Sequence, residues 1–160
     1  MSRERCFHSR SPAQTRQLGR ALGERLRGGD VVAISGPLGA GKTCLVQGLA
    51  EGLGVDPRVP VTSPTFGIVA EYPARAWLRH ADFYRVESYA RLLDAGFDDL
   101  TDVSGVLVVE WPERFPEALP GDRLEIRIDP GPGPEERQIR VSARGERAEK
   151  IQEELEARWP

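Results

Sequence analysis

Lysine is almost absent from this chain of 160 residues, which carries its positive charge on arginine instead. Only Lys42 and Lys150 stand beside twenty arginines, so the choice of lysine at position 42 is unusual for this chain. Cysteine is also scarce. The spacing of Cys6 and Cys44 excludes a metal site built from clustered cysteines. We interpret Cys44 as a small core residue rather than as a redox centre.

The chain also lacks an excess of positive charge and any long apolar stretch. Its 25 acidic and 22 basic side chains leave a net charge of -3, which gives no overall case for direct nucleic-acid binding. No run of residues approaches a membrane span, and no signal peptide is recognisable. We therefore expect a cytoplasmic protein without membrane attachment, folded as one domain over residues 1–160.

What the chain does have is a glycine-rich octapeptide at residues 36–43, Gly-Pro-Leu-Gly-Ala-Gly-Lys-Thr. It fits the phosphate-binding pattern G-x-x-x-x-G-K-[ST]. The apolar run 31–34 before it predicts a buried strand, and a helical pattern after it runs from Lys42 to about Leu53 and stops at Gly54. Strand, glycine-rich loop and helix in this order are the setting in which the pattern binds nucleotide phosphates.

Each residue type in this loop has a chemical reason. Glycines let successive N–H groups point inward around an anion, and the positive end of the following helix adds to the attraction. Lys42 can reach the β- and γ-phosphates, and the Thr43 hydroxyl can bind Mg²⁺. The alternative is a strand-to-helix turn that binds nothing. The residues that we expect to contact the nucleotide here are Gly36, Gly39, Ala40, Gly41, Lys42, Thr43 and Cys44.

Hydrophobic periodicity predicts the remaining elements. Leucines every four residues from 18 to 26 predict an amphipathic helix that begins at residues 11–12 and ends at the glycine pair 28–29. Residues 1–10 are either frayed or a short edge strand. The other predicted elements are strands at 67–72, 76–84, 106–109, 124–128 and 138–141, and helices at 88–94 and 146–158.

Two of the strand pairs read as antiparallel hairpins, so the sheet cannot be purely parallel. Together the patterns predict an α/β protein of the P-loop NTPase-like class, with three layers and a mixed central sheet that includes antiparallel hairpins.

A nucleotide site needs a carboxylate near the metal, and Glu110 directly follows the buried run 106–109. This position lies at the sheet edge where the phosphates would sit, so we expect Glu110 to bind Mg²⁺. Aspartate is the usual residue in this role, so glutamate is a departure. The alternative is an ordinary charged residue at a strand end.

Three further residues are candidates for the site. Asp82 sits in a strand flanked by aromatic residues. It is expected to position the attacking water or to bind Mg²⁺ through water, unless it forms an ion pair with Arg79 or Arg85. Thr65 follows a proline and is a candidate switch contact to the γ-phosphate, or else part of a strand-entry turn. Trp111 is expected to stack on the nucleotide or on a partner, or else to pack in the core.

Four sequence blocks make the chain resemble the TsaE (YjeE) family, the ATPase subunit of the bacterial machinery that makes threonylcarbamoyladenosine in tRNA. They are the loop 36–43, Ser-Pro-Thr-Phe at 63–66, His-Ala-Asp-Phe-Tyr-Arg at 80–85 and Glu-Trp-Pro-Glu at 110–113. An opening segment at 11–15 is also similar. Each of the last three blocks alone is weak, but their order and spacing are specific.

The resemblance implies ATP and Mg²⁺ as cofactors. It implies catalytic roles for Lys42, Asp82 and Glu110, Mg²⁺ binding by Thr43 and Glu110, and nucleotide contacts from Thr15, Thr65, Trp111 and Arg137. It also implies two partners: a TsaD-like carbamoyltransferase, which modifies the adenosine next to the anticodon, and its non-catalytic companion, a TsaB-like protein. ATP hydrolysis by the TsaE subunit would reset that pair between turnovers, and tRNA would be contacted only through the complex.

Two other functions remain open on the residues alone. A small-molecule P-loop kinase shares the loop and the size, although no arginine-rich lid is evident. A nucleotide-gated binding module would use ATP only to order the segment 63–66, without hydrolysis. For the ATPase we expect slow turnover of the isolated chain, because one small domain lacks a full set of groups that stabilise the transition state.

Overall fold

The computed structural model describes residues 3–64 and 67–159. The strands are β1 (Glu4–Ser9), β2 (Val31–Ser35), β3 (Val69–Tyr72), β4 (Trp77–Asp82), β5 (Gly105–Glu110), β6 (Arg123–Pro130) and β7 (Arg137–Arg144). The helices are α1 (Pro12–Gly23), α2 (Lys42–Leu53), α3 (Tyr89–Asp94) and α4 (Glu146–Arg158), with 3-10 turns at Phe97–Thr101, Pro112–Arg114 and Pro116–Ala118.

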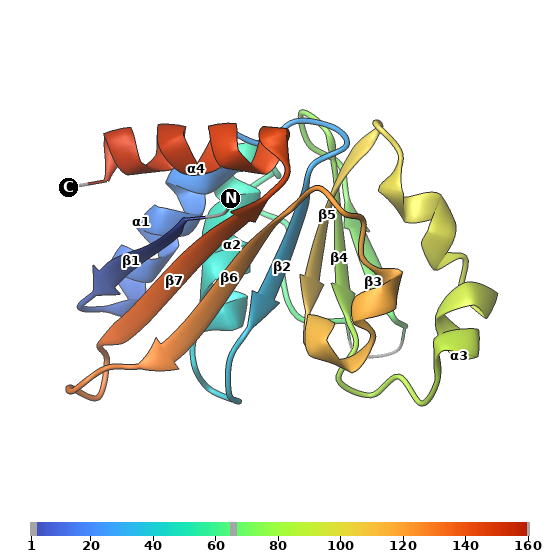
Figure 1. Ribbon diagram of the computed structural model, residues 1–160, viewed down its shortest axis with the longest axis horizontal. Coiled ribbons are helices and arrows are strands. Elements are labelled where there is room, and N and C mark those ends of the chain that lie inside the picture. The colour runs from blue at the N-terminus through green and yellow to red at the C-terminus, as the bar shows by residue number, and fades with distance from the viewer. Residues whose placement is uncertain (1–2, 65–66, 160) are drawn as a thin grey trace.

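The strands form one sheet in the order β1-β7-β6-β2-β5-β4-β3 (Figure 1). The four central strands β6, β2, β5 and β4 run parallel, and the pairs β1–β7, β6–β7 and β3–β4 are antiparallel. All six residues of β5 are buried, as expected of a strand covered on both faces. The predicted mixed sheet with antiparallel hairpins is confirmed, and so is the edge-strand alternative for residues 1–10.

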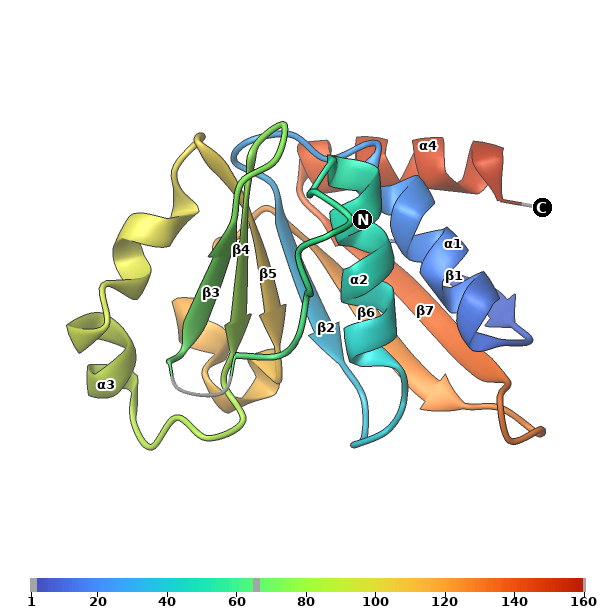
Figure 2. The same cartoon turned by 180° about the vertical axis from the view of Figure 1, so that it is seen from behind.

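Helices cover both faces of the sheet. One hydrophobic cluster joins α1, α2 and α4 to one face, and in Figure 2 α1 and α2 lie in front of the strands. A second cluster joins α3 and the 3-10 turns to the other face over β4 and β5. The even-numbered residues of β4 and β5 point towards the α2 side, since Leu78, Val106 and Val108 belong to the first cluster. That alternation decides which side chains reach the loop 36–43.

Glycines let α1 and α2 pack at very short range. A Cβ added at Gly19 or Gly23 of α1 would overlap the backbone of α2, and one at Gly48 or Gly52 would overlap the backbone of α1. The four residues form one contact because each pair is spaced four apart, on one face of its helix. This contact sets the position of α2, whose first residue closes the loop.

The predicted end of the first helix was wrong, because α1 stops at Gly23 rather than at residues 28–29. The guanidinium of Arg75 supports the chain at this early end. It donates hydrogen bonds to the carbonyls of Gly23 and Leu26, at 3.0 and 2.8 Å, and to that of Leu53 at the end of α2, at 3.1 Å. Carbonyls that the helices leave unpaired are thus satisfied by a distant side chain. Leu26 stays buried although it lies beyond the helix.

The other helices follow the expected limits. Helix α2 ends before Gly54, which has a left-handed φ of 97°, and α4 covers the predicted residues 146–158. Within residues 3–64 and 67–159, no helix is both long enough and apolar enough to cross a bilayer.

The helix contact can be tested with Gly48→Ala. Helix propensity alone favours alanine by about 1 kcal/mol. Because the added methyl group meets the backbone of α1, we expect instead a loss of about 1–3 kcal/mol of folding free energy. Thermal unfolding should show it as a lower melting temperature, by about 2–4 °C per kcal/mol. Gly121→Ala is the control, since a Cβ there meets no atom within 4 Å. A higher melting temperature for Gly48→Ala would contradict this packing.

Candidate functional site

The loop 36–43 joins the end of β2 to the start of α2. Gly36, Gly39 and Gly41 have φ values of 148°, 77° and 104°, which L side chains rarely adopt. Gly41 also caps α2 and has no side chain to bond the first N–H groups of the helix. Those N–H groups remain available to an anion in front of the helix, where the helix dipole adds positive potential.

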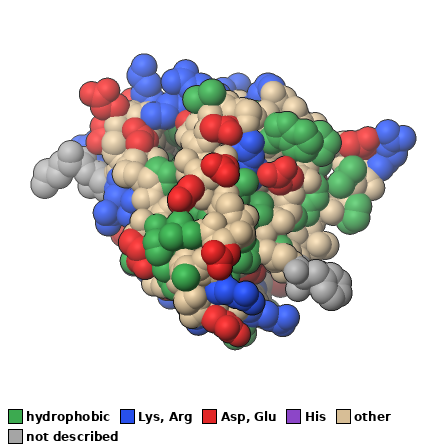
Figure 3. All heavy atoms as spheres, turned by 90° about the vertical axis from the view of Figure 1, so that its right-hand side faces the viewer, with side chains coloured by type: hydrophobic (Ala, Val, Ile, Leu, Met, Phe, Trp, Pro, Cys, Tyr) green, Lys and Arg blue, Asp and Glu red, His purple; other side chains and the backbone are tan. Residues whose placement is uncertain are grey.

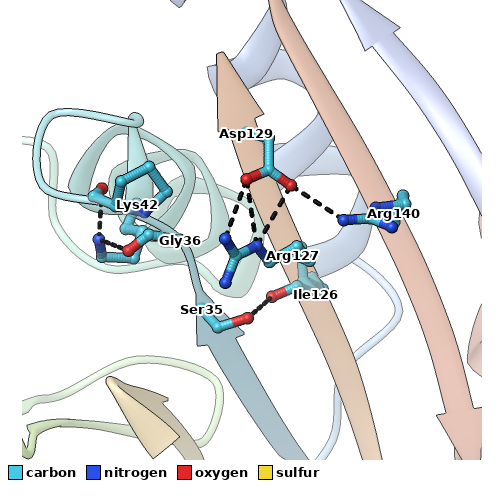
Figure 4. A network of polar contacts seen from close by, with 8 residues as sticks. Ser35, Gly36, Lys42, Ile126, Arg127, Asp129 and Arg140 are labelled. Atoms are coloured by element: carbon cyan, nitrogen blue, oxygen red, sulfur yellow. Dashed lines mark hydrogen bonds and ion pairs between the residues drawn. The ribbon is translucent and has the colours of Figure 1, made fainter. Parts of the chain in front are cut away.

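Lys42 is buried inside this loop. Its Nζ donates hydrogen bonds to the carbonyls of Gly36 and Pro37, at 2.5 and 2.8 Å. Figure 4 shows the bond to Gly36. It also lies 4.4 Å from the centre of the Trp111 ring, a cation–π contact. Burial lowers the pKa of Lys42, and the carboxylate of Glu110 opposes that shift. The carboxylates of Glu113 and Asp82 act on the ammonium in the same direction as Glu110, whereas its hydrogen bonds go to the loop carbonyls.

Asp82 and Glu110 end the adjacent parallel strands β4 and β5 and are partners in register. Both lie on the side of the sheet that faces α2. Asp82 accepts a hydrogen bond from the backbone N–H of Tyr84 at 2.9 Å, and burial raises its pKa, with a further contribution from Glu110. The alternative ion pair with Arg79 does not form, because that guanidinium is bonded to Asp102 at 2.9 Å.

A chain of polar contacts connects the helix start to the strand ends. Thr43 Oγ1 lies 3.1 Å from Ser63 Oγ, and Ser63 donates to Glu110 Oε2 at 3.3 Å. The same carboxylate oxygen lies 2.5 Å from His80 Nε2, and both His80 and Glu110 are buried. Hydroxyl and carboxylate oxygens from three segments thus come together, and such hard oxygen donors suit Mg²⁺. The residues present fit that cation.

Trp111 has a strained backbone that aims its ring into the site. It is the one non-glycine residue with a positive φ, 59°, in the described part of the chain. Its ring packs against Tyr84 with centroids 4.9 Å apart. A bulky residue in this conformation costs free energy, and such strain is typical of functional sites. The ring is partly buried: it lines the cleft and also packs against the second hydrophobic cluster.

These groups line a single cleft of about 680 Å³, a size common for ligand sites. Its lining includes the predicted residues Gly39, Gly41, Lys42, Thr43, Asp82, Glu110 and Trp111. It continues past the strand ends to Arg85 and Arg91 near α3. Figure 3 looks onto the α3 side of the molecule, where acidic side chains lie between separate hydrophobic patches.

Five predicted contact residues lie outside this lining. Two of them, Gly36 and Ala40, belong to the glycine-rich loop itself. Thr15 is buried in α1, with its hydroxyl 2.7 Å from that of Ser9. Cys44 donates its thiol to the carbonyl of Pro12 at 3.2 Å, and burial raises its pKa. Arg137, at the start of β7, contacts the loop itself. Thr65, the predicted switch residue, lies outside the described residues.

Arg137 binds the backbone of the glycine-rich loop. Its Nε donates to the carbonyl of Ala40 at 2.8 Å, and the same guanidinium donates to Glu136 O at 2.8 Å. The loop is thus fastened to the β6–β7 hairpin. Arg127 of β6 points to the other face of the sheet and is bonded to Asp129, as Figure 4 shows.

Sequence reasoning missed two members of the site, Ser63 and His80. Both stand in the short blocks noted above, but no spacing rule says that a serine and a histidine 17 positions apart meet on one carboxylate. The alternation of β4 was the available signal, because it places His80 on the same side of the strand as Asp82.

The fold and the cleft together define an α/β protein with the three-layer architecture of P-loop NTPases. The family model described as "Threonylcarbamoyl adenosine biosynthesis protein TsaE" matches residues 9–139, and the chain belongs to this family.

Relatives agree with that assignment over most of the chain. The tRNA threonylcarbamoyladenosine biosynthesis protein TsaE of Streptomyces coelicolor is 45% identical over 145 residues, covering 82% of this chain and 92% of that protein. The protein of the same name from Bacillus subtilis is 40% identical, covering 91% and 89%. The crystal structure of Bacillus subtilis YdiB matches with a TM-score of 0.81 at 34% identity, covering 98% of this chain and 97% of that one.

The raised pKa of Asp82 leads to a pH-dependent prediction. Below the ordinary pKa of 3.8 this carboxyl group does not lower the free energy of unfolding. The free energy of unfolding falls as the pH rises from there through the higher pKa that the group has in the folded protein. Asp82→Asn keeps an acceptor for Tyr84 and removes the charge. We expect a higher melting temperature at neutral pH and a gain that shrinks towards about pH 4. Thermal unfolding across this range checks it, and a gain that does not change with pH would contradict it.

Asp102 provides a control, because its pKa is shifted in the opposite direction from that of Asp82. Hydrogen bonds from Ser104 and Arg79 lower its pKa to about 2. Asp102→Asn should therefore lower the melting temperature at neutral pH, and this loss should shrink as the pH falls from about 3.8 towards 2.

Hydrogen exchange can test whether Arg137 fastens the loop. Arg137→Met removes the donors to the loop carbonyls, so we expect faster amide exchange in residues 36–43. Arg140→Met is the matched control, because this neighbour on β7 is bonded to Asp129 and not to the loop. Equal exchange in the two variants would show that the loop holds its shape without Arg137.

Proposed function

We propose that this chain is an Mg²⁺-dependent ATP-binding and ATP-hydrolysing subunit that acts on a TsaB–TsaD complex in the synthesis of threonylcarbamoyladenosine in tRNA. The observation that carries the proposal is that the glycine-rich loop and a cluster of hydroxyl and carboxylate oxygens lie in the same cleft. The glycine-rich loop leads into the first turn of α2. The hydrogen-bonded side chains of Thr43, Ser63 and Glu110 connect that turn to the end of β5.

In this proposal, the N–H groups of residues 36–43 and the ammonium of Lys42 hold the β- and γ-phosphates. Thr43 and Glu110 hold Mg²⁺, which when bound neutralises charge on the phosphates. Asp82 orients the attacking water and accepts its proton, a task that its raised pKa favours. Lys42 must leave the carbonyls of Gly36 and Pro37 to reach a phosphate, so nucleotide binding competes with those two bonds.

We base the proposed biological role on the names of the relatives. Their names place them in tRNA threonylcarbamoyladenosine biosynthesis. A TsaD-like carbamoyltransferase and a TsaB-like protein are the partners that we propose for this chain, in the cytoplasm. The net charge of -3 supports a division of labour in which the partners hold the tRNA.

A nucleotide-gated binding module is the second candidate, and Ser63 favours it. Its hydroxyl bonds to Thr43 and Glu110, the two residues proposed to bind Mg²⁺. A cation bound between Thr43 and Glu110 competes with Ser63 for the Thr43 hydroxyl, and the backbone of residues 62–64 has to respond. In this version, ATP repositions the segment to change partner binding, and hydrolysis plays no part.

ATP hydrolysis measured with and without added TsaB–TsaD separates the two candidates. The ATPase proposal predicts slow turnover of the chain alone, a rise with the pair, and a loss of about 100-fold or more in Lys42→Ala. Lys150→Ala is the matched control, because it removes the other lysine, an exposed residue of α4.

The remaining outcomes each point elsewhere. ATP binding without hydrolysis under either condition would favour the gated module. Hydrolysis that Lys42→Ala leaves intact would overturn the assignment of the site, and hydrolysis that ignores the partner pair would overturn the biological role alone.

A further inference from the structure

His80 is a buried histidine that the proposed reaction leaves without a task. Its side chain is fully buried in β4, and Nε2 lies 2.5 Å from Glu110 Oε2. The other ring nitrogen, Nδ1, is buried and has no hydrogen-bond partner among the described residues. A polar side chain with this burial is costly unless its one contact is strong.

The surroundings of the ring fix which nitrogen carries the proton. A carboxylate oxygen only accepts hydrogen bonds, so Nε2 must be the donor in this contact. A proton placed on Nδ1 instead would leave a buried donor unsatisfied and would turn a nitrogen lone pair towards the carboxylate. A ring with its proton on Nε2 is therefore the form that fits the hydrogen bonds. Strand β4 sets the orientation of the His80 ring, and the hydrogen bond from the ring orients the carboxylate of Glu110.

The carboxylate of Glu110 has two oxygens with different surroundings. Oε2 receives hydrogen bonds from both His80 and Ser63. Oε1 receives none from residues 3–64 and 67–159, and Glu110 lines the cleft. One oxygen is thus held by the protein, and the other is left for a ligand. Metal-bound carboxylates typically have such supporting hydrogen bonds.

We propose that His80 is a positioning residue of the cation site: by donating from Nε2 to Glu110 Oε2, it fixes the carboxylate so that Oε1 faces the divalent cation. The role rests on the proposed function, because it presumes that Glu110 binds Mg²⁺. His80 itself touches neither cation nor nucleotide. Its removal should weaken cation binding and leave the glycine-rich loop able to bind phosphates.

The other histidine of the chain provides a matched control. His8 also pairs with a carboxylate, Glu136, at 3.0 Å, but the two side chains are 42% and 32% exposed and lie away from the cleft. An exposed pair of this kind contributes little to structure or binding. A change at His8 therefore removes a histidine–carboxylate contact without disturbing the site.

The experiment compares four variants: His80→Leu, His80→Gln, His80→Asn and His8→Leu. Gln places an amide N–H near the position of Nε2, whereas Asn places it near Nδ1. ADP affinity is measured with EDTA and with Mn²⁺, and Mn²⁺ binding is followed by electron paramagnetic resonance. None of these readouts depends on turnover.

We expect His80→Leu to bind Mn²⁺ about 10–100-fold more weakly in the presence of ADP, with metal-free ADP affinity unchanged. His80→Gln should recover most of the loss, His80→Asn should not, and His8→Leu should match the wild type. If His80→Leu does not fold, the contrast between Gln and Asn decides the matter.

Two results would overturn the role of His80. One is wild-type Mn²⁺ affinity in folded His80→Leu, and the other is equal affinity in the Gln and Asn variants. A wild-type chain whose ADP affinity does not respond to Mn²⁺ would instead overturn the proposed function, and the positioning role with it.

Discussion

A buried carboxylate at the end of a buried strand is the constraint on which the site depends. Glu110 is 3% exposed, and a carboxylate at that depth is costly unless the protein or a ligand satisfies it. His80 and Ser63 satisfy one of its oxygens, and the Lys42 ammonium opposes its charge. Asp82 on the next strand adds a second acidic group in register. Under the proposed function, a bound divalent cation would balance the charge of these two acidic groups.

The rest of the fold holds the parts around that carboxylate in place. The parallel register of β4, β5 and β2 brings two acidic strand ends to the edge from which the loop 36–43 departs. Four glycines bring α1 and α2 into backbone contact, and Arg75 joins the ends of both helices. Far from the cleft, Arg147 of α4 forms two bonds of 3.0 Å to the buried Asp30 just before β2. The strand that leads into the loop is therefore anchored at its beginning as well.

Many helices and strands, and the position of Glu110, could be predicted from the sequence because their signals lie within short stretches of the chain. Periodicity and glycine stops predict the helix after the loop and the helix at 146–158. The position of Glu110 at a strand end is predicted by a charge placed directly after four apolar residues. The errors and omissions involve contacts between distant segments. Helix α1 ends early at Gly23, whose carbonyl is bonded by Arg75, a side chain 52 positions further on. The contacts of His80 and Ser63 with Glu110 depend on strand order and on loop placement, which no local pattern contains.

The most direct test of this account is the effect of Mg²⁺ on ADP affinity, measured by titration calorimetry for the wild type and for Glu110→Gln. The substitution keeps the size of the side chain and an acceptor for His80, but removes the charge that the cation requires. We expect Mg²⁺ to tighten ADP binding by the wild type about tenfold or more. In Glu110→Gln this effect should disappear while metal-free affinity stays the same. An equal response to Mg²⁺ in both proteins would show that Glu110 does not hold the cation and would contradict the account at its centre.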